Sequence, residues 1–331
     1  MNSSVTMSQP VEVRRAQPTD VERLVALHHA AFGSQWTDEH WRHRYDRGPV
    51  QRGEVVAAFS ADGRCLATFC GVVLPCRFAG EPGLVCRAGD VAVHPELQTN
   101  PAGPRLLLRV CSRFVDELRG SVGFIFGFPQ PGLSRTLIRH CRYEVMADVC
   151  WLVSGRDALP KPQPNGPTIS TDGHVPDDAD RMLAELARQT PSGLVRDQRY
   201  LRWRYLRQPE SKHAVLTARS ATGAVIAAAV VGCNSQHDDA VVIAEWLVPR
   251  QEHATAGALL SGVRSFAASQ GRQHVVTAFQ GHTPEFAEMQ QAGFRVQVSP
   301  HQFVYRPYSN RMSRRFLFDN WYWSPGDLDF I

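Results

Sequence analysis

The stretch Asp90-Val-Ala-Val-His-Pro-Glu-Leu-Gln-Thr-Asn-Pro-Ala-Gly-Pro-Arg-Leu-Leu-Leu108 decides the fold of this chain. It begins with Val91 and Val93, whose β-branched side chains favour a strand. The segment then turns and opens a helix, which we expect to run from about Gly103 to Leu118. The first N–H groups of a helix have no partner inside it, and the helix dipole favours negative charge there. A strand that enters a helix in this way predicts a phosphate site.

The same stretch resembles the acyl-CoA-binding motif of the GCN5-related N-acetyltransferases, Val-x-Val-x-Pro-x-x-Arg/Gln-x-x-Gly-x-Gly/Ala. The residues in register are Val91, Val93, Pro95, Gln98 and Gly103. Pro101 stands where the motif has its middle glycine, and a proline removes one main-chain donor. The resemblance implies acetyl-CoA, or another acyl-CoA, as co-substrate. It also implies that the co-substrate is bound by Val91, Ala92, Val93, Gln98, Thr99, Asn100, Pro101, Ala102 and Gly103.

The composition is that of a globular protein with a large core. The chain has 331 residues, of which 43% are hydrophobic and 21% charged, and its net charge is +4. No run reaches the roughly 20 apolar residues of a membrane span, and no basic stripe indicates nucleic-acid binding. The eight cysteines form no Cys-x-x-Cys pair and sit among apolar residues, so we expect reduced thiols in a cytoplasmic protein. No histidine spacing indicates a metal site.

The chain repeats itself. Trp-Arg-His-Arg-Tyr-Asp-Arg-Gly-Pro at 41–49 matches Leu-Arg-Trp-Arg-Tyr-Leu-Arg-Gln-Pro at 201–209, an offset of 160 residues. Further along, Pro95 and Gly103 match Pro249 and Gly257 at an offset of 154. We interpret the Arg-x-Arg-Tyr segments as helix-packing residues whose arginines pair with carboxylates. Two homologous units therefore share the chain.

Each unit is expected to have the acetyltransferase order of elements: helix, helix, hairpin, strand, helix, strand, helix, strand. The predicted fold class is a mixed α/β sheet protein made of two tandem acetyltransferase-fold domains. In the first unit we predict a hairpin at Glu144–Val153 as the last element. The expected divisions are a disordered lead at 1–10, a first domain at 11–157 that binds acyl-CoA, a linker at 158–168, a degenerate second domain at 169–308, and an aromatic and acidic tail at 309–331.

The acyl-CoA is assigned to the first unit. In the second unit Glu252 stands where the motif has Arg or Gln, and its carboxylate would repel a pyrophosphate. Thr255 replaces the middle glycine there. We therefore expect the second unit to complete the acceptor pocket rather than bind the co-substrate.

For the general base we favour Asp90, whose pKa apolar neighbours would raise. The alternative is that Asp90 caps a turn at the strand end. His94 and Glu96, on either side of Pro95, are further candidates for the base. The family's tyrosine acid has no match, because Leu137 or Ile138 takes its place, so the leaving thiolate would take its proton from water.

Further polar groups are candidates for binding. Gln130 and Ser134 could contact the co-substrate, or could simply form a strand-to-helix loop with Ser134 as helix cap. Asp327 and Asp329, beside the aromatic residues of the tail, suit an ammonium or sugar hydroxyls, or a solvated terminus.

The function implied is transfer of an acyl group, expected to be acetyl, from CoA to a primary amine by direct attack on the thioester. The acceptor would be a small molecule such as an amino sugar, and the protein a monomer or homodimer. Transfer to a hydroxyl or a protein lysine is the alternative chemistry. A binding or regulatory protein that keeps the fold without catalysis is the alternative class, favoured by Pro101 and the missing tyrosine.

Overall fold

The computed structural model describes residues 10–50, 53–164, 166–209, 211–233, 238–250 and 252–328, so residues 1–9 of the expected lead lie outside it. The chain forms two compact units. Unit 1 contains residues 1–75, 83–146 and 303–315, and unit 2 contains residues 76–82, 147–302 and 316–331.

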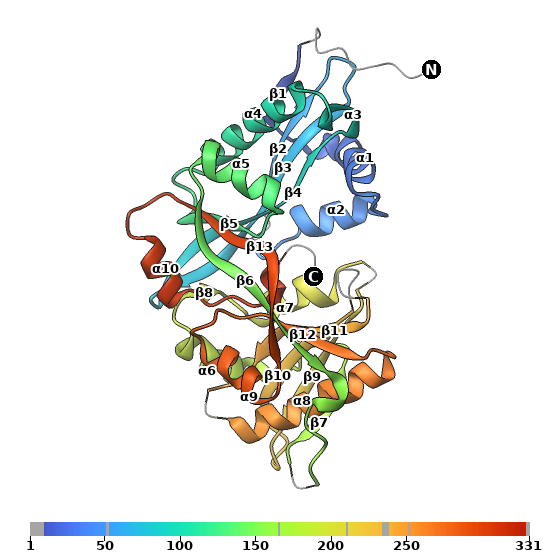
Figure 1. Ribbon diagram of the computed structural model, residues 1–331, viewed down its shortest axis with the longest axis vertical. Coiled ribbons are helices and arrows are strands. Elements are labelled where there is room, and N and C mark those ends of the chain that lie inside the picture. Colours follow the sequence, from blue (N-terminus) through green and yellow to red (C-terminus); the bar gives the residue numbers. More distant parts are fainter. Residues whose placement is uncertain are drawn as a thin grey trace. The chain divides into compact units, whose positions relative to one another are not determined.

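Unit 1 contains the first copy of the repeat. Its elements are β1 (Glu12–Arg15), α1 (Val21–Phe32), α2 (Asp38–Tyr45), β2 (Gly53–Phe59), β3 (Cys65–Phe78), β4 (Glu81–Val93), α3 (Pro95–Gln98), α4 (Ala102–Glu117), β5 (Phe124–Gly127), α5 (Pro131–Cys141) and the start of β6 (Glu144–Gly155). The strands follow the order β1-β2-β3-β4-β5, and the end of β13 (Arg295–Pro307) pairs with β5. In Figure 1, α4 and α5 lie side by side, and α1 lies beside α2.

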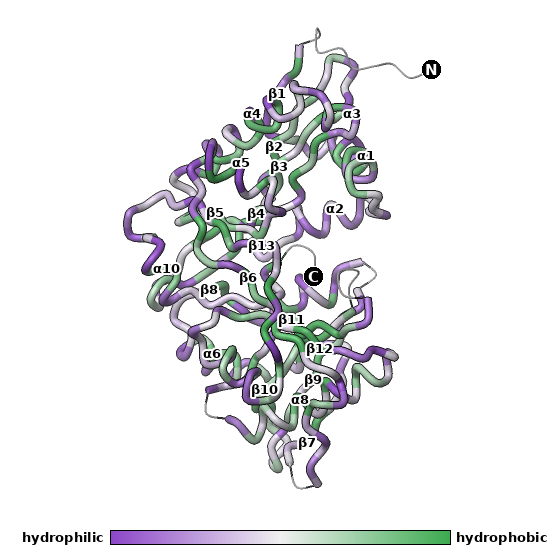
Figure 2. The backbone as a smooth tube through the Cα atoms, in the orientation of Figure 1, coloured by the Kyte–Doolittle hydropathy of each residue, from purple (hydrophilic) through white to green (hydrophobic). Residues whose placement is uncertain are grey.

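Unit 2 repeats the pattern with the rest of the chain. It contains β7 (Thr168–Asp172), α6 (Asp180–Gln189), β8 (Gly193–Leu194), α7 (Gln198–Leu201), η4 (Arg202–Leu206), β9 (His213–Arg219), β10 (Val225–Gly232), β11 (Ala240–Leu247), α8 (His253–Ser269), β12 (His274–Thr277), α9 (Pro284–Gln291), α10 (Arg314–Asn320) and η5 (Pro325–Asp327). Its strand order is β6-β12-β11-β10-β9-β7. Every residue of β11 is buried, and Figure 2 shows this strand in green.

The last element of the first unit differs from the prediction. Glu144–Gly155 is one strand of 12 residues and not a hairpin, and its end pairs with β12 of unit 2. Correspondingly, the end of β13 pairs with β5 of unit 1. The compact units therefore are not continuous in sequence, whereas the predicted ranges 11–157 and 169–308 are. A single strand without a turn cannot form a hairpin. The main-chain groups at the end of β6 therefore pair with β12, and those at the end of β13 pair with β5.

Each unit has its own core. In unit 1 the aromatic rings of Phe69 and Phe114 lie 4.3 Å apart at its centre, and both side chains are fully buried. In unit 2, α8 packs on β9, β10 and β11 through Leu259, Val263 and their neighbours. All eight cysteines are free thiols and six are buried, which confirms the predicted core positions. Within the described ranges, no helix combines the length and the apolar character that crossing a membrane requires.

Candidate acyl-CoA and acceptor site

The motif of unit 1 adopts the predicted strand, turn and helix. Strand β4 ends at Val93, the short helix α3 follows, and α4 begins at Ala102. Gly103 lies so close to α3 that a Cβ added to it would be 2.1 Å from the carbonyl oxygen of Leu97. Only glycine permits this contact, so the motif glycine fixes the approach of α4 to the preceding turn.

A pocket with a volume of about 340 Å³ lies beside the start of α4. It is enclosed by α4 on one side and α5 on the other, and its lining includes Val93, Gln98 and Gly103 of the predicted binding residues. The remaining predicted binding residues lie along the same strand and loop without lining it: Val91, Ala92, Thr99, Asn100, Pro101 and Ala102. The pocket is therefore at the place where the motif predicts the co-substrate.

The predicted cradle of main-chain donors is wrong for this helix. The N–H of Ala102 donates to Asn100 Oδ1 at 2.9 Å, and the N–H of Gly103 donates to the carbonyl of Asn100 at 2.9 Å. Pro104 has no N–H at all. Asn100 thus satisfies the donors that the prediction left free, as asparagine does at turns. Arg105, which follows at once, is exposed and has no ion-pair partner among the described residues.

Strand β4 separates from β5 beyond Arg87. Their parallel pairing joins Cys86 to Ile125 and Arg87 to Phe126, and no further pair follows in the described part of these strands. Asp90, which follows three residues later and lies three residues before the end of β4, has a φ of 47°. A non-glycine residue in this region is strained, and strain of this kind is concentrated at functional sites.

The carboxylate of Asp90 is surrounded by one hydrogen-bond donor, one cation and one imidazole. The phenol of Tyr45 donates to Oδ2, and Nε of Arg44 lies 3.1 Å from the same oxygen. On the other side, Nε2 of His28 lies 3.4 Å from Oδ1. Burial alone would raise the pKa of Asp90, but the charge of Arg44 and the hydrogen bonds from His28 and Tyr45 outweigh burial and hold this pKa well below its usual range.

The expected raised pKa of Asp90 is therefore wrong, because the sequence does not show that Arg44 faces it. A carboxylate this acidic accepts a proton poorly at neutral pH. The interpretation of the Arg-x-Arg-Tyr segment is confirmed here, since Arg44 pairs with a carboxylate and Tyr45 binds the same group.

His28 is the side chain that sequence reasoning missed. Its Nδ1 lies 2.7 Å from Oγ of Ser34, its Nε2 faces Asp90, and its ring stacks on Trp36 with centroids 4.2 Å apart. Only 7% of His28 is exposed. In the sequence it falls on the buried face of α1, where helical spacing assigns it to the core.

The other candidates lie apart from this cluster. Nδ1 of His94 is 3.9 Å from Oε2 of Glu96 and has no hydrogen-bond partner among the described residues. Gln130 precedes α5 and is exposed, and its carbonyl accepts the N–H of Ser134 at 2.9 Å. Ser134 is 2% exposed. Neither Gln130 nor Ser134 lines the pocket between α4 and α5.

Unit 2 carries a matching carboxylate and tyrosine. The phenol of Tyr205, which the repeat matches to Tyr45, donates to Oε1 of Glu245 on β11 at 2.8 Å. Strand β11 has an irregularity at Ala244, since Val230 pairs with Glu245 and Val231 with Ile243. Ala244 is the residue that the offset of 154 matches to Asp90, so both motif strands are distorted at the same repeat position.

The C-terminal tail covers this second site. Arg196 lies 2.8 Å from Oε2 of Glu245 and 2.7 Å from Oδ2 of Asp327, and Ser324 donates to the same Glu245 oxygen at 2.7 Å. Arg204 donates to the carbonyls of Gly326 at 3.1 Å and Leu328 at 2.8 Å. A Cβ on Gly326 would lie 1.7 Å from the hydroxyl of Tyr205, so the tail backbone sits directly on the tyrosine.

This placement does not fit the expected role of Asp327 in substrate binding. The residue is fully buried, and its ion pair with Arg196 fastens the tail to unit 2. Burial raises the pKa of Asp327, although the charge of Arg196 opposes this. Asp329 lies outside the described residues.

The helix start of unit 2 is acidic, as predicted. Glu252 is the N-cap of α8, and its Oε2 accepts the hydroxyl of Thr255 at 3.1 Å. In the described part of the chain, no cluster of three or more His, Cys, Asp or Glu side chains could hold a metal ion.

Comparisons with known proteins identify the fold. No family model and no curated protein matches the chain. A solved structure of a conserved protein from Enterococcus faecalis has a TM-score of 0.68 and 16% identity, over 91% of this chain and 73% of that one. A GCN5-related N-acetyltransferase from Kribbella flavida has a TM-score of 0.61 and 16% identity, over 91% and 72%. A tandem GNAT protein from the clavulanic acid biosynthesis pathway has a TM-score of 0.58 and 14% identity, over 91% and 99%. The chain therefore has the fold of the GCN5-related N-acetyltransferases, with two such domains in tandem.

Proposed function

We propose that this protein is an acyl-CoA-dependent N-acyltransferase that moves an acyl group, in the first instance acetyl, to a primary amine. Unit 1 carries the reaction. The observation that supports this most directly is the pocket between α4 and α5, which the motif residues Val93, Gln98 and Gly103 line. In unit 2 the corresponding carboxylate and tyrosine are covered by the tail, and Glu252 stands at the helix start.

The residues of unit 1 fit the two ends of an acyl-CoA differently. The pocket is lined mostly by apolar side chains such as Leu97, Leu107 and Leu133, which suit the pantetheine arm. The main-chain donors expected for the pyrophosphate are already used by Asn100. Arg105 and the pocket residue His140 are the side chains that would replace them.

The chemistry starts with an ammonium group that must lose its proton. We assign this proton to His28, reached directly or through the hydroxyl of Ser34, while the ionised Asp90 orients the ring. The neutral amine then attacks the thioester carbonyl, the C–N bond forms and the C–S bond breaks. Tyr45 cannot easily reprotonate the thiolate, because burial and the charge of Asp90 raise the pKa of its phenol well above the usual range. Water supplies that proton.

The acceptor is proposed to be a small molecule such as an amino sugar. One structure of the same fold is a glucosamine N-acetyltransferase region of a fungal multi-domain β-N-acetylglucosaminidase, with a TM-score of 0.57 and 11% identity, over 92% of this chain and 39% of that one. The competing chemistry is transfer to a hydroxyl or to a protein lysine. Turnover of a panel containing glucosamine, its 2-hydroxyl analogue glucose and a lysine peptide separates these acceptors.

Calorimetry with acetyl-CoA tests the assignment to unit 1. In Gly103→Glu, any side chain must displace the Leu97 carbonyl, and a carboxylate is added at the pocket, so binding should be lost. Gly257→Glu is the matched control: the repeat assigns Gly257 to the same position in unit 2, where an added Cβ meets nothing within 4 Å. It should bind as wild type does.

A second variant tests the contact with the pyrophosphate separately from the pocket proposed for the pantetheine arm. Arg105→Ala should weaken acetyl-CoA binding by about five- to tenfold and reduce its dependence on salt, because one exposed charge is removed. If wild type does not bind acetyl-CoA, or if Gly257→Glu and not Gly103→Glu abolishes binding, the proposal fails. The first result would favour a binding or regulatory protein that keeps only the fold.

A further inference from the structure

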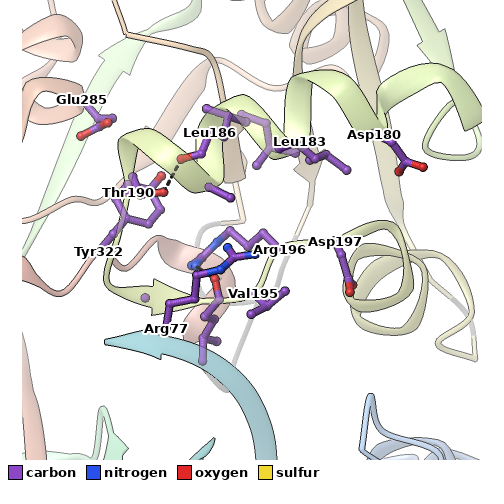
Figure 3. Close-up of a pocket in the computed structure, with 15 residues that line it drawn as sticks. Arg77, Asp180, Leu183, Leu186, Thr190, Val195, Arg196, Asp197, Glu285 and Tyr322 are labelled. Atoms are coloured by element: carbon purple, nitrogen blue, oxygen red, sulfur yellow. Dashed lines mark hydrogen bonds between the residues drawn. The ribbon is translucent and has the colours of Figure 1, made fainter. Parts of the chain in front are cut away.

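Unit 2 contains a second pocket, separate from the co-substrate pocket of unit 1. Its volume is about 240 Å³, and it lies below α6, as Figure 3 shows. Aliphatic side chains make most of its wall: Leu183, Leu186 and Ala187 come from α6, Leu194 from β8 and Leu247 from the end of β11. A cavity of about 150 Å³ holds benzene, so this one accommodates a body of roughly six to eight carbons.

The acidic groups at the pocket are already paired. Oδ1 of Asp180 accepts the amide of Gln198 at 2.9 Å, and Oδ1 of Asp197 accepts the N–H of Tyr200 at 2.7 Å. Glu285 lies 3.5 Å from Arg250 through Oε1. Each of the three carboxylates therefore has at least one partner, and Oε2 of Glu285 is the buried acidic oxygen at the pocket that has none among the described residues.

The basic groups differ from one another. Arg196 lies between Glu245 and Asp327, so its charge is balanced by two carboxylates. Arg77 lies at the end of β3, in the segment 76–82 that belongs to unit 2, and lines the same pocket. It is partly buried and has no ion pair or side-chain hydrogen bond within the described ranges. A partly buried cation without a counter-ion at the end of an apolar pocket favours an anion.

A second observation also indicates a ligand. The hydroxyl of Tyr322 is buried, lines the pocket and has no hydrogen-bond partner among the described residues, so it is free to donate to a carboxylate. Oε2 of Glu285, which is also buried there without a partner among these residues, can only accept, from a water or a ligand hydroxyl. Buried polar atoms without a partner in native proteins mark the place of a water or a bound molecule.

We propose that this pocket binds a small amphipathic monocarboxylate. Its carboxylate pairs with Arg77, and its apolar body lies along the leucines of α6. The site goes beyond the proposed acyl transfer and does not depend on it, because none of its residues lines the co-substrate pocket. Tyr322 and Arg196, which form part of the wall, also anchor the tail, so the ligand would contact residues that hold the tail in place.

Hexanoate, hexanol and hexylamine are the probes for calorimetry or ligand-observed NMR with the full chain. They share the apolar body and differ in charge. We expect hexanoate to bind with a Kd on the order of 1 mM or below, and at least tenfold more tightly than hexylamine. Tighter binding of hexylamine, or no binding of hexanoate at about 10 mM, would overturn the proposal.

Two variants locate the site. Arg77→Gln should reduce hexanoate affinity about tenfold and leave hexanol unchanged, because only the charge is lost. Ala187→Phe should remove binding of both, because it fills the pocket. Arg295→Gln removes the same charge from an exposed position of unit 2 outside the pocket and should leave binding unchanged. Circular dichroism and thermal melting check that each variant is folded. If Arg77→Gln binds hexanoate as wild type does, the carboxylate is not at Arg77 and the proposal is wrong, whatever Ala187→Phe shows.

Discussion

The two units contain the same buried pair of a tyrosine and a carboxylate, but different groups face this pair in each unit. In each unit a tyrosine at the end of an Arg-x-Arg-Tyr segment donates to a carboxylate on the distorted motif strand. In unit 1 the carboxylate of Asp90 faces His28, which in turn faces Ser34. In unit 2 the carboxylate of Glu245 faces the chain's own tail. In each unit the shared pair joins the helical segment to the motif strand, and the groups that face this pair differ between the units.

A single position contributes much of this difference. The offset of 160 matches Trp36 in unit 1 to Arg196 in unit 2. Trp36 stacks on His28 and adds no charge, whereas Arg196 binds Glu245 and brings in the second carboxylate, Asp327. The arginine in unit 2 therefore binds an acidic segment, the tail, beside the carboxylate. The tryptophan in unit 1 binds no acidic segment among the described residues, and the imidazole of His28 faces the carboxylate instead.

The largest effect expected from this comparison is on stability. Arg196→Met leaves Glu245 and Asp327 buried without their cation, and breaking a buried ion pair costs about 3–5 kcal/mol. Arg44→Met should cost less, about 1–2 kcal/mol, because Asp90 keeps its contacts with His28 and Tyr45. Urea unfolding followed by tryptophan fluorescence measures both. An equal loss in the two variants would mean that the tail adds nothing to the second site.

The next effect is on turnover. Asp90→Asn tolerates the left-handed backbone but removes the charge that holds His28, so kcat should fall about 100-fold with little change in the Kd of acetyl-CoA. Glu245→Gln is the counterpart in unit 2 and should keep kcat with the same amine. His28→Gln should lower kcat to a similar extent as Asp90→Asn. Unchanged turnover in Asp90→Asn would remove this residue from the reaction, and a loss in Glu245→Gln would remove the distinction between the units.

The sequence predicts local elements and the repeat well, because both depend on short-range patterns. Helix α4 was expected from about Gly103 to Leu118 and spans Ala102–Glu117, and the fold class is confirmed. The exchange of β6 and β13 was not predicted. The residues of a strand predict that its main-chain groups need a partner strand, but they do not predict which strand of the sheet that partner is.

The site was predicted less completely, for a related reason. The use of Asn100 Oδ1 to satisfy the N–H of Ala102 could have been inferred, since asparagine side chains commonly bind nearby main-chain groups. The contact of His28 with Asp90 could not, because 62 residues separate them and helical spacing explains His28 as a core residue. Likewise the ion pair of Asp327 could not be predicted, because its partner Arg196 lies 131 residues earlier in the sequence.

The smallest expected effect is a difference in pH dependence, and it has opposite signs in the two units. The folded-state pKa of Asp90 is lowered, so its contribution to stability is fully present above its unfolded pKa of about 3.9 and is lost as the pH falls below that value. The folded-state pKa of Asp327 is raised, so stability is lost as the pH rises from about 3.9 through that higher value. The cost of Asp90→Asn should therefore grow between pH 3 and pH 7, by about 1 kcal/mol, because only the ionisation of the unfolded-state carboxyl falls within that range. The cost of Asp327→Asn should shrink over the same range, because asparagine mimics the protonated acid. Unfolding in urea at several pH values measures both slopes, and slopes of the same sign would show that the tail carboxylate is held ionised as firmly as Asp90.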